Sequence, residues 1–284
     1  MRVIQSLRRL QVWRCRMGQQ NPRIGFVPTM GALHEGHLSL MRRARKECDL
    51  VVVSIFVNPL QFGPAEDLGR YPRTFQADRK ACEQAGVDLI FFPQVKDLYP
   101  STFQTSVVVK QLTQRWEGEI RPTHFQGVTT VVTKLLNLVG PHRAYFGQKD
   151  YQQYIVIKQL VEDLSLPVTI IRCPTVREAD GLAMSSRNRY LGATERELAT
   201  VLYRALSAGK KAITDGVRSG KKIQQNMMRL CKKHPELSID YFTVCHPLTL
   251  EPLTRVDREA VLLGALRIGK VRLIDNMFAF LGSA

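Results

Sequence analysis

The sequence lacks the features of several protein classes. Among its 284 residues no apolar run approaches the roughly 20 residues needed to cross a bilayer, which excludes a transmembrane helix. Its six cysteines contain no CxxC pair and no spacing typical of a disulfide framework or a zinc site. They are Cys15, Cys48, Cys82, Cys173, Cys231 and Cys245. Scattered cysteines of this kind predict a reducing compartment, and we expect the cytoplasm.

Acidic residues are scarce. Asp and Glu number 25 against 41 Lys and Arg, which gives a formal net charge of +16. Such an excess attracts either nucleic acid or small anionic substrates. The sequence has no RNP, KH or zinc-finger motif, and its basic residues are not interleaved with the aromatic residues that stack on single-stranded bases. We therefore expect no specific nucleic acid partner and no membrane partner, and nucleic-acid binding is kept as an alternative.

The dinucleotide fingerprint GxGxxG is also absent, as is any convincing Ser-His-Asp or Cys-His arrangement. What is present is an alternation of near-continuous apolar segments with amphipathic ones. We expect strands over residues 24–28, 50–57, 87–92, 144–146 and 168–172, and helices over 75–85, 127–139 and 151–164. This alternation predicts an α/β fold, a Rossmann-like parallel sheet with helices on both faces.

Two further helices are expected near the N-terminus, on either side of a first strand that begins near Ile24. The first of them carries on one face Leu7, Leu10 and Trp13. The second, HLSLMRRARKEC, carries on one side Leu38, Met41 and Ala44.

The character of the sequence changes near Pro174. Beyond it, helices over 194–213 and 219–234 and short strands near 239–244 and 260–266 are typical of a smaller α+β domain. We expect a Rossmann-like domain over residues 1–174 and a C-terminal lid domain over residues 175–284.

The segment VPTMGALHEGH, Val27 to His37, joins a strand end to a helix start through a glycine turn. Such a turn directs helix N-terminal amides and a partial positive charge at a bound anion, which suits phosphate oxygens. His34 and His37 can donate hydrogen bonds to charged oxygens, although an isolated histidine at a helix start commonly caps the helix or lies in solvent. The HEGH spacing is not the four-residue spacing of zinc proteases, so a zinc site is not expected. Two histidines on either side of a glycine in a strand-to-helix turn favour phosphate contact.

Two polar turns follow later in the chain. In GQKD, Gly147 ends a strand and Lys149 lies where an ammonium could reach phosphate, but an ordinary turn with a solvated lysine fits the tetrapeptide as well. In MSSRN, Ser185, Ser186 and Arg187 supply two hydroxyls and a guanidinium, which suit either a turn or a phosphate clamp.

Two glutamines suit a small polar acid. Gln61 and Gln153 each offer amide donors and an acceptor for hydroxyls and a carboxylate, although each taken alone is typical of a surface residue. Ligands of open parallel sheets bind beyond the carboxyl ends of the strands. We therefore expect one cleft, roofed by the second domain, at which these segments converge: 28–37, 58–61, 146–153 and 184–187.

Five long blocks, in order and spacing, resemble the pantoate-β-alanine ligase family. This family belongs to the HxGH nucleotidyltransferase superfamily, which includes the class I aminoacyl-tRNA synthetases. The blocks are VPTMGALHEGH (27–37), SIFVNPLQFGPAEDLGRYPRT (54–74), HFQGVTTVVTKLLNLV (124–139), AYFGQKDYQQ (144–153) and READGLAMSSRNRYL (177–191). From residue 192 onward the resemblance is weaker, and RLIDN (272–276) is its clearest match.

The resemblance implies an ATP-dependent condensation of pantoate with β-alanine, through a pantoyl adenylate, with release of pyrophosphate and AMP. It implies Mg²⁺ as cofactor, with protein ligands unknown. The residues that it implies in charge stabilisation during catalysis are His34, His37, Lys149 and Arg187. Those that it implies in ATP binding are Met30, Gly31, Ala32, Leu33, His34, Glu35, Gly36, His37, Gly147, Gln148, Lys149, Asp150, Val176, Met184, Ser185, Ser186 and Arg187.

By the same resemblance Gln61 and Gln153 bind pantoate, with Gln61 also near the entry of β-alanine. Further family positions near the cleft are matched by Asn58, Tyr71, Arg121 and His124. The resemblance also implies a homodimer. The alternative within the superfamily is an adenylyl- or cytidylyltransferase with a different acceptor, and the paired glutamines and the MSSRN segment argue against it.

The chain departs from the family pattern at two places. Thr123 stands where the family has glycine, in RPTHF, and CHP at 245–247 interrupts the run before TLEPL. We expect these departures to alter loop detail but not the reaction.

Overall fold

The computed structural model describes residues 1–64 and 66–282, and the chain forms two compact units. The first unit comprises Met1–Gly147 and Gln153–Pro174, and the second comprises Gln148–Gln152 and the chain from Thr175 onward. The segment Gln148–Gln152, which the sequence analysis assigns to the first domain, thus belongs to the second unit. Each unit is described by itself below.

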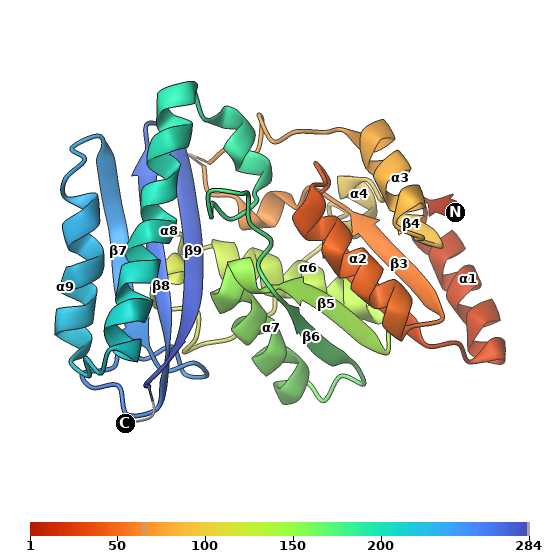
Figure 1. Ribbon diagram of the computed structural model, residues 1–284. Helices are drawn as coiled ribbons and strands as arrows, with labels where there is room; N and C mark the ends of the chain where they lie inside the picture. The colour runs from red at the N-terminus through yellow and green to blue at the C-terminus, as the bar shows by residue number, and fades with distance from the viewer. Residues whose placement is uncertain (65, 283–284) are drawn as a thin grey trace. The chain divides into compact units, whose positions relative to one another are not determined.

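A parallel sheet of six strands forms the centre of the first unit (Figure 1). Its strands, in their order across the sheet, are β1 (Arg2–Ile4), β4 (Leu89–Phe91), β3 (Leu50–Ile55), β2 (Ile24–Thr29), β5 (Arg143–Gly147) and β6 (Thr169–Cys173). The chain passes from β2 through β3 to β4 toward one edge and from β5 to β6 toward the other. The strand order therefore reverses between β2 and β5, which is where open parallel sheets bind their ligands. The predicted Rossmann-like fold is confirmed.

Helices cover both faces of this sheet (Figure 1) because successive strand residues point to opposite sides. Phe26 belongs to the core on one side and its neighbour Val27 to the core on the other. The helices of the first core are α1 (Leu7–Gln20), α6 (His124–Val139) and α7 (Tyr151–Asp163), with the single turn α4 (Val95–Leu98). The helices of the second core are α2 (Glu35–Glu47) and α3 (Phe75–Gln84). A further short helix is α5 (Glu117–Ile120).

The second unit packs two helices on an antiparallel sheet (Figure 1). Its strands, in sheet order, are β7 (Leu237–Cys245), β8 (Glu259–Ile268) and β9 (Val271–Phe280). Helix α8 (Ala193–Thr214) packs on β8 and β9, and α9 (Gly220–Cys231) packs on β7. Leu202 of α8, Ile223 of α9 and Phe242 of β7 are fully buried in the shared core. This arrangement is the small α+β unit that the sequence predicts.

The structure refines the prediction in several details. The first strand is β1, not the segment at Ile24, and it pairs with β4 in parallel. Helix α6 begins at His124, one turn before the predicted start. Strand β9 has no counterpart in the prediction, and β7 and β8 are 9 and 10 residues long rather than short. In α2 the buried apolar residues are Leu40, Met41 and Ala44, with Leu38 half-buried against the same core.

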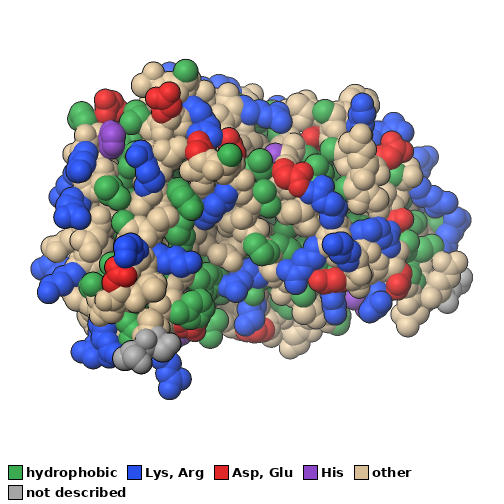
Figure 2. Space-filling view, in the orientation of Figure 1, with side chains coloured by type: hydrophobic (Ala, Val, Ile, Leu, Met, Phe, Trp, Pro, Cys, Tyr) green, Lys and Arg blue, Asp and Glu red, His purple; other side chains and the backbone are tan. Residues whose placement is uncertain are grey.

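Basic side chains are not gathered into one patch on the face that Figure 2 shows. Figure 2 shows Lys and Arg spread over the visible face with Asp and Glu among them. On this face the excess of 41 basic over 25 acidic residues is thus spread among both signs of charge, and a general positive field that attracts anions stays a prediction. Within the described ranges, no helix has both the length and the apolar character that crossing a membrane requires.

Candidate active site

The HxGH segment forms the turn between β2 and α2. The strand ends at Thr29, His34 is the N-cap, and α2 begins at Glu35. Gly31 (φ +81°) and Ala32 (φ +49°) both adopt left-handed backbone, which reverses the chain sharply between strand and helix. The predicted β-to-α turn is confirmed, and the first amides of α2 lie where an anion is stabilised.

A buried carboxylate from α3 holds this turn in place. Asp78, only 3% exposed, accepts hydrogen bonds from the backbone N–H of Ala32 (3.1 Å) and of Leu33 (2.8 Å). The hydroxyl of Thr74 donates to the same carboxylate at 3.2 Å. The sequence analysis missed Asp78. Its signal is an acidic residue on the inward side of an amphipathic helix, one turn before the buried Cys82.

The two histidines of the motif are oriented by backbone hydrogen bonds to Nδ1. The N–H of Gly36 donates to Nδ1 of His34 (3.1 Å), and the N–H of His34 donates to Nδ1 of His37 (3.3 Å). The ring centroids are 4.1 Å apart. Because a nitrogen that accepts a hydrogen bond carries no proton, the neutral rings hold their proton on Nε2. In this tautomer each ring carries a hydrogen-bond donor on Nε2, the type of group that anionic oxygens accept from.

Gln61 is fixed by its neighbours at the end of the 3-10 turn η1 (Pro59–Gln61), which follows β3. The Asn58 amide donates to the Gln61 side-chain oxygen (3.0 Å) and to the Gly127 carbonyl (3.0 Å). Tyr99 donates its hydroxyl to the Asn58 oxygen at 2.8 Å. The Gln61 amide nitrogen then lies 3.1 Å from the sulfur of Met30. The structure thus brings together two of the predicted site residues, Gln61 and Met30.

Helix α6 approaches η1 closely at Gly127. A Cβ atom there would lie 2.2 Å from the carbonyl oxygen of Leu60, so only glycine permits this approach. The first turn of α6 also carries His124, whose Nδ1 lies 3.0 Å from the Gln61 carbonyl oxygen. Burial, together with the charge of Arg121, lowers the pKa of His124 to about 4. His124 is therefore a neutral donor that fixes the Gln61 backbone.

Arg121 contacts the same carbonyl and a carboxylate. It donates to the Gln61 oxygen (3.3 Å) and makes a bidentate pair with Glu66 at 2.8 and 2.6 Å. Although burial opposes it, the Arg121 pair lowers the pKa of the Glu66 carboxyl from its ordinary value. Of the four further family positions, Asn58, Arg121 and His124 thus surround Gln61. Tyr71 is buried, with its ring edge-on to Phe62 at 5.9 Å.

Two more predicted residues of the first unit lie on β5 and α7. Gly147 is the last residue of β5, the strand that pairs with β2 at the reversal of the strand order. Gln153 is half-buried in the first turn of α7. Both elements are those that the sequence predicts.

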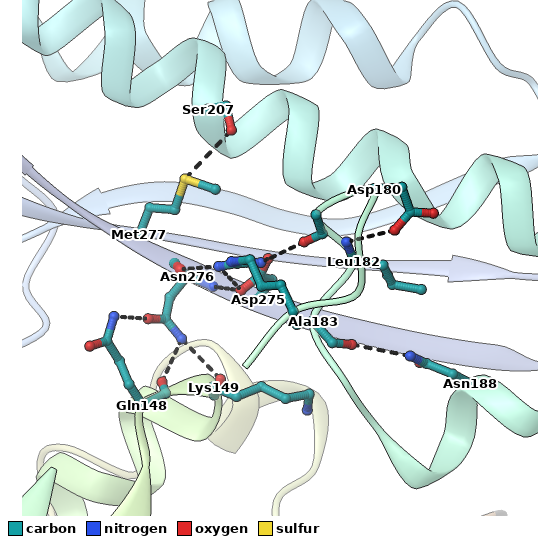
Figure 3. A network of polar contacts seen from close by, with 12 residues as sticks. Gln148, Lys149, Asp180, Leu182, Ala183, Asn188, Ser207, Asp275, Asn276 and Met277 are labelled. Atoms are coloured by element: carbon teal, nitrogen blue, oxygen red, sulfur yellow. Dashed lines mark hydrogen bonds and ion pairs between the residues drawn. The ribbon is translucent and has the colours of Figure 1, made fainter. Parts of the chain in front are cut away.

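The predicted Lys149 lies in the second unit, in the 3-10 turn η2 (Gln148–Asp150). Its side chain is 20% exposed, and Nζ lies 3.6 Å from a carboxylate oxygen of Asp150. The carbonyl oxygens of Gln148 and Lys149 both accept hydrogen bonds from the side-chain amide of Asn276 (Figure 3). The sequence analysis gave Asn276 no role beyond its place in RLIDN.

The Ser185–Arg187 loop follows a short hairpin in the second unit. The N–H of Met184 donates to the Val176 carbonyl (3.0 Å), and the N–H of Arg187 donates to the Ser185 hydroxyl (3.3 Å). Ser185 thereby caps the 3-10 turn η3 (Ser186–Tyr190), in which Ser186 is buried. Two hydroxyls and a guanidinium therefore belong to one short, capped segment, and their use as a phosphate clamp stays a prediction.

The predicted residues therefore form two sets, one in each unit. That these two sets of residues meet in one cleft stays a prediction. Across the described ranges no group of three or more His, Cys, Asp or Glu side chains is arranged to hold a metal ion. Magnesium bound chiefly through nucleotide phosphates and water needs no such group.

Comparison with known proteins decides the family. The family described as pantoate-beta-alanine ligase matches residues 2–278. The chain belongs to this family. Pantothenate synthetase from Thermotoga petrophila is 50% identical over 276 residues, which are 97% of this chain and 99% of that protein.

Solved structures of the pantoate-beta-alanine ligase family agree with the fold. Pantothenate synthetase from Thermus thermophilus is 48% identical, with a TM-score of 0.93 over 98% of this chain and 99% of that one. The enzyme from Francisella tularensis, solved in complex with beta-gamma ATP and beta-alanine, is 36% identical. Its TM-score is 0.81 over 98% of this chain and 97% of that one.

The two departures from the family pattern are accommodated locally. Thr123 has right-handed helical backbone (φ −94°, ψ −10°), which any residue adopts, so the replacement of glycine causes no strain there. In CHP, Nδ1 of His246 accepts hydrogen bonds from the N–H groups of Leu248 (3.2 Å) and Thr249 (3.3 Å). The carbonyl of Pro247 accepts the hydroxyl of Tyr151 at 2.8 Å. That these departures alter loop detail relative to the family stays a prediction.

Proposed function

We propose that this chain condenses pantoate with β-alanine in an ATP-dependent reaction that passes through pantoyl adenylate. The observation that carries the proposal is the oriented pair His34 and His37 at the start of α2, in a chain that matches the pantoate-beta-alanine ligase family over residues 2–278. Two Nε2–H donors and a helix N-terminus are suited to phosphoryl oxygens, and the parallel sheet carries them beside its point of reversal.

In the first step a pantoate carboxylate oxygen attacks the α-phosphorus of ATP. The bond from that phosphorus to the bridging oxygen breaks, and pyrophosphate leaves. In the second step the β-alanine amine attacks the activated carbonyl, AMP leaves with the electron pair of the broken C–O bond, and the amine loses a proton. Neither step uses a side-chain nucleophile, so the protein contributes positioning and stabilisation of charge.

In this proposal His34, His37, Lys149 and Arg187 donate to the phosphoryl oxygens and the leaving pyrophosphate. The hydroxyls of Ser185 and Ser186 also bind phosphate. The remaining ATP contacts that we propose are made by Met30, Gly31, Ala32, Leu33, Glu35, Gly36, Gly147, Gln148, Asp150, Val176 and Met184. The implied cofactor Mg²⁺ would be bound together with ATP and would neutralise phosphate charge.

Pantoate binds, in the same proposal, to Gln61 and Gln153. The Gln61 side-chain oxygen accepts from Asn58, so the donor for a substrate oxygen is its amide NH₂ group, which also contacts the Met30 sulfur. Fixing the amide in this way avoids the entropic cost of ordering a mobile glutamine when pantoate binds.

We also propose a homodimer in the cytoplasm and no specific nucleic acid partner. The six cysteines are free thiols, five of them buried, as suits a reducing compartment. The dispersed basic side chains of Figure 2 suit attraction of ATP and pantoate better than recognition of a base sequence. Light scattering of the purified protein tests the dimer directly.

The fate of oxygen tests the reaction. With pantoate labelled by ¹⁸O in its carboxylate, an adenylate intermediate transfers one labelled oxygen to the phosphate of AMP, and the nucleotide product is AMP. Formation of ADP, or of AMP without label, would contradict the proposal. A dinucleotide product would instead support a nucleotidyltransferase with another acceptor.

A further inference from the structure

The side chain of Asn276, in β9, forms hydrogen bonds to the backbone of the turn that carries Lys149 (Figure 3). Its side-chain amide donates to the carbonyl oxygens of Gln148 (2.7 Å) and Lys149 (2.9 Å), and its oxygen accepts from the Gln148 side chain at 3.3 Å. Asn276 is 2% exposed, so water cannot readily replace these bonds. One buried side chain thus fixes two successive peptide units of η2.

Asp275, the residue before Asn276, forms an ion pair with Arg177, which lies shortly before the Ser185–Arg187 loop. Arg177 makes a bidentate pair with the Asp275 carboxylate at 2.6 and 3.0 Å. It also donates to the Gly181 carbonyl (3.0 Å) and lies over the ring of Tyr203 at 4.9 Å. The Asp275 carboxylate, 4% exposed, in turn accepts the backbone N–H of Asn276 at 2.7 Å. The hydrogen bonds to η2 and the ion pair with Arg177 are therefore made by two consecutive residues, Asn276 and Asp275.

Arg177 opens the hairpin that leads into the Ser185–Arg187 loop. It forms a β-bridge with Ala183, directly before the MSSRN segment. The far side of the loop is tied back, because the Asn188 amide donates to the Ala183 carbonyl (3.1 Å) and to Glu178 (3.0 Å). Figure 3 shows the dipeptide between the two segments, with Gln148 and Lys149 on one side and Ala183 and Asn188 on the other.

We propose that Asn276 is a positioning residue that holds the Lys149 turn directly, beside the Asp275–Arg177 pair that anchors the segment leading into the Ser185–Arg187 loop. The inference rests on the proposed function, in which both segments contact the ATP phosphates. A 3-10 turn with both carbonyls fixed sets the direction in which the Lys149 side chain leaves the backbone. Asn276 itself is buried behind the turn and acts only through it.

The test uses pyrophosphate exchange into ATP by the full-length protein. Asn276→Ala removes three hydrogen bonds, and we expect kcat to fall about tenfold or more, since small misplacements of charge-stabilising groups are costly. Asn276→Ser keeps one donor and should lie between the wild type and the alanine variant. Gln224→Ala is the matched control, because the Gln224 amide donates to the Phe242 carbonyl (2.7 Å) in the same unit. It should change kcat less than about twofold.

A double-mutant cycle with Lys149→Ala separates positioning from general damage. If Asn276 acts through Lys149, Asn276→Ala should cost less than about threefold in the Lys149→Ala background. An equal loss in both backgrounds would overturn the proposal, as would a loss in Asn276→Ala no larger than that in Gln224→Ala. If Asn276→Ala does not fold, Asn276→Ser replaces it in the double-mutant cycle with Lys149→Ala. The same two results would then overturn the proposal.

The wild type reports on the proposed function independently. Exchange that does not require pantoate would contradict the substrate assignment, while the cycle would still show whether Asn276 acts through Lys149. Exchange that requires pantoate, with additive losses in the cycle, would leave the function standing and refute the positioning role.

Discussion

Replacement of Asp78 by alanine tests how the HxGH turn is held. Asp78 accepts the N–H groups of Ala32 and Leu33, and Ala32 sits at φ +49°, a conformation that costs an L-residue about 1–2 kcal/mol. The carboxylate thus stabilises a strained turn that places His34. Removing it deprives the N–H groups of Ala32 and Leu33 of this acceptor.

The magnitude follows from these contacts. Each hydrogen bond to a charged group contributes about 1.5–3 kcal/mol, and removal of a buried charge recovers part of its desolvation cost. We therefore expect Asp78→Ala to lower the free energy of unfolding by about 2–4 kcal/mol, or the Tm by roughly 4–16 °C. Displacement of His34 and His37 should lower kcat/KM for ATP by about tenfold or more.

Urea denaturation followed by circular dichroism gives the stability, and pyrophosphate exchange gives the activity. Asp163→Ala is the control, because Asp163 is exposed at the end of α7 and accepts a hydrogen bond from the Gln159 side chain, so the change should be within about 0.5 kcal/mol. If Asp78→Ala were as stable and as active as Asp163→Ala, the argument that the carboxylate holds the turn would be refuted.

The Asp78→Ala variant should also change the titration of Cys82. The pKa of the Cys82 thiol, raised to about 12 by burial and by the Asp78 charge, should fall in Asp78→Ala but stay above its ordinary value.

Three further outcomes are expected. His37→Ala and Lys149→Ala should each lower kcat/KM for ATP by about 10²-fold or more with the fold intact, since each removes a donor aimed at developing charge. Gln153→Ala should raise KM for pantoate and leave KM for ATP nearly unchanged, since it removes a hydrogen bond to one substrate only. Because the folded pKa of His124 is about 4 and the ordinary value about 6.5, the unfolded chain binds more protons between these values. The stability contributed by neutral His124 should therefore be complete above about pH 6.5 and fall by up to about 3 kcal/mol as the pH drops toward 4.

Each of these has a result that would contradict it. A loss below about threefold in His37→Ala or Lys149→Ala would return that residue to a structural or solvated role. Equal damage to pantoate and ATP binding would contradict the role of Gln153. For His124, the slope of unfolding free energy between pH 6.5 and 4 should flatten in His124→Gln, and an unchanged slope would show that another group titrates there.

The sequence could predict those features that depend on local pattern. The strand-turn-helix at Val27–His37, the alternation that builds the parallel sheet, and the placement of Gly147 at a strand end all follow from periodicities of 2 and 3.6 and from turn residues. The three residues of β1 carry only one buried side chain, which is too little pattern to distinguish a strand from a loop.

The supporting groups could not be predicted because they come from distant parts of the chain. Asp78 reaches Ala32 across 46 residues, and Asn276 reaches Gln148 across 128. A single polar residue on an otherwise ordinary helix or strand leaves no periodic signal, and only the packing of the elements decides what it contacts. The assignment of Gln148–Gln152 to the second unit has the same origin, because β9 supplies the partner of that turn.

The central claim is that pantoate is activated as its adenylate before β-alanine reacts. Exchange of labelled pyrophosphate into ATP, measured with a panel of small carboxylic acids, tests it most directly. We predict exchange that requires pantoate and magnesium and proceeds without β-alanine. Exchange supported equally by unrelated acids, or exchange that appears only when β-alanine is present, would contradict the account.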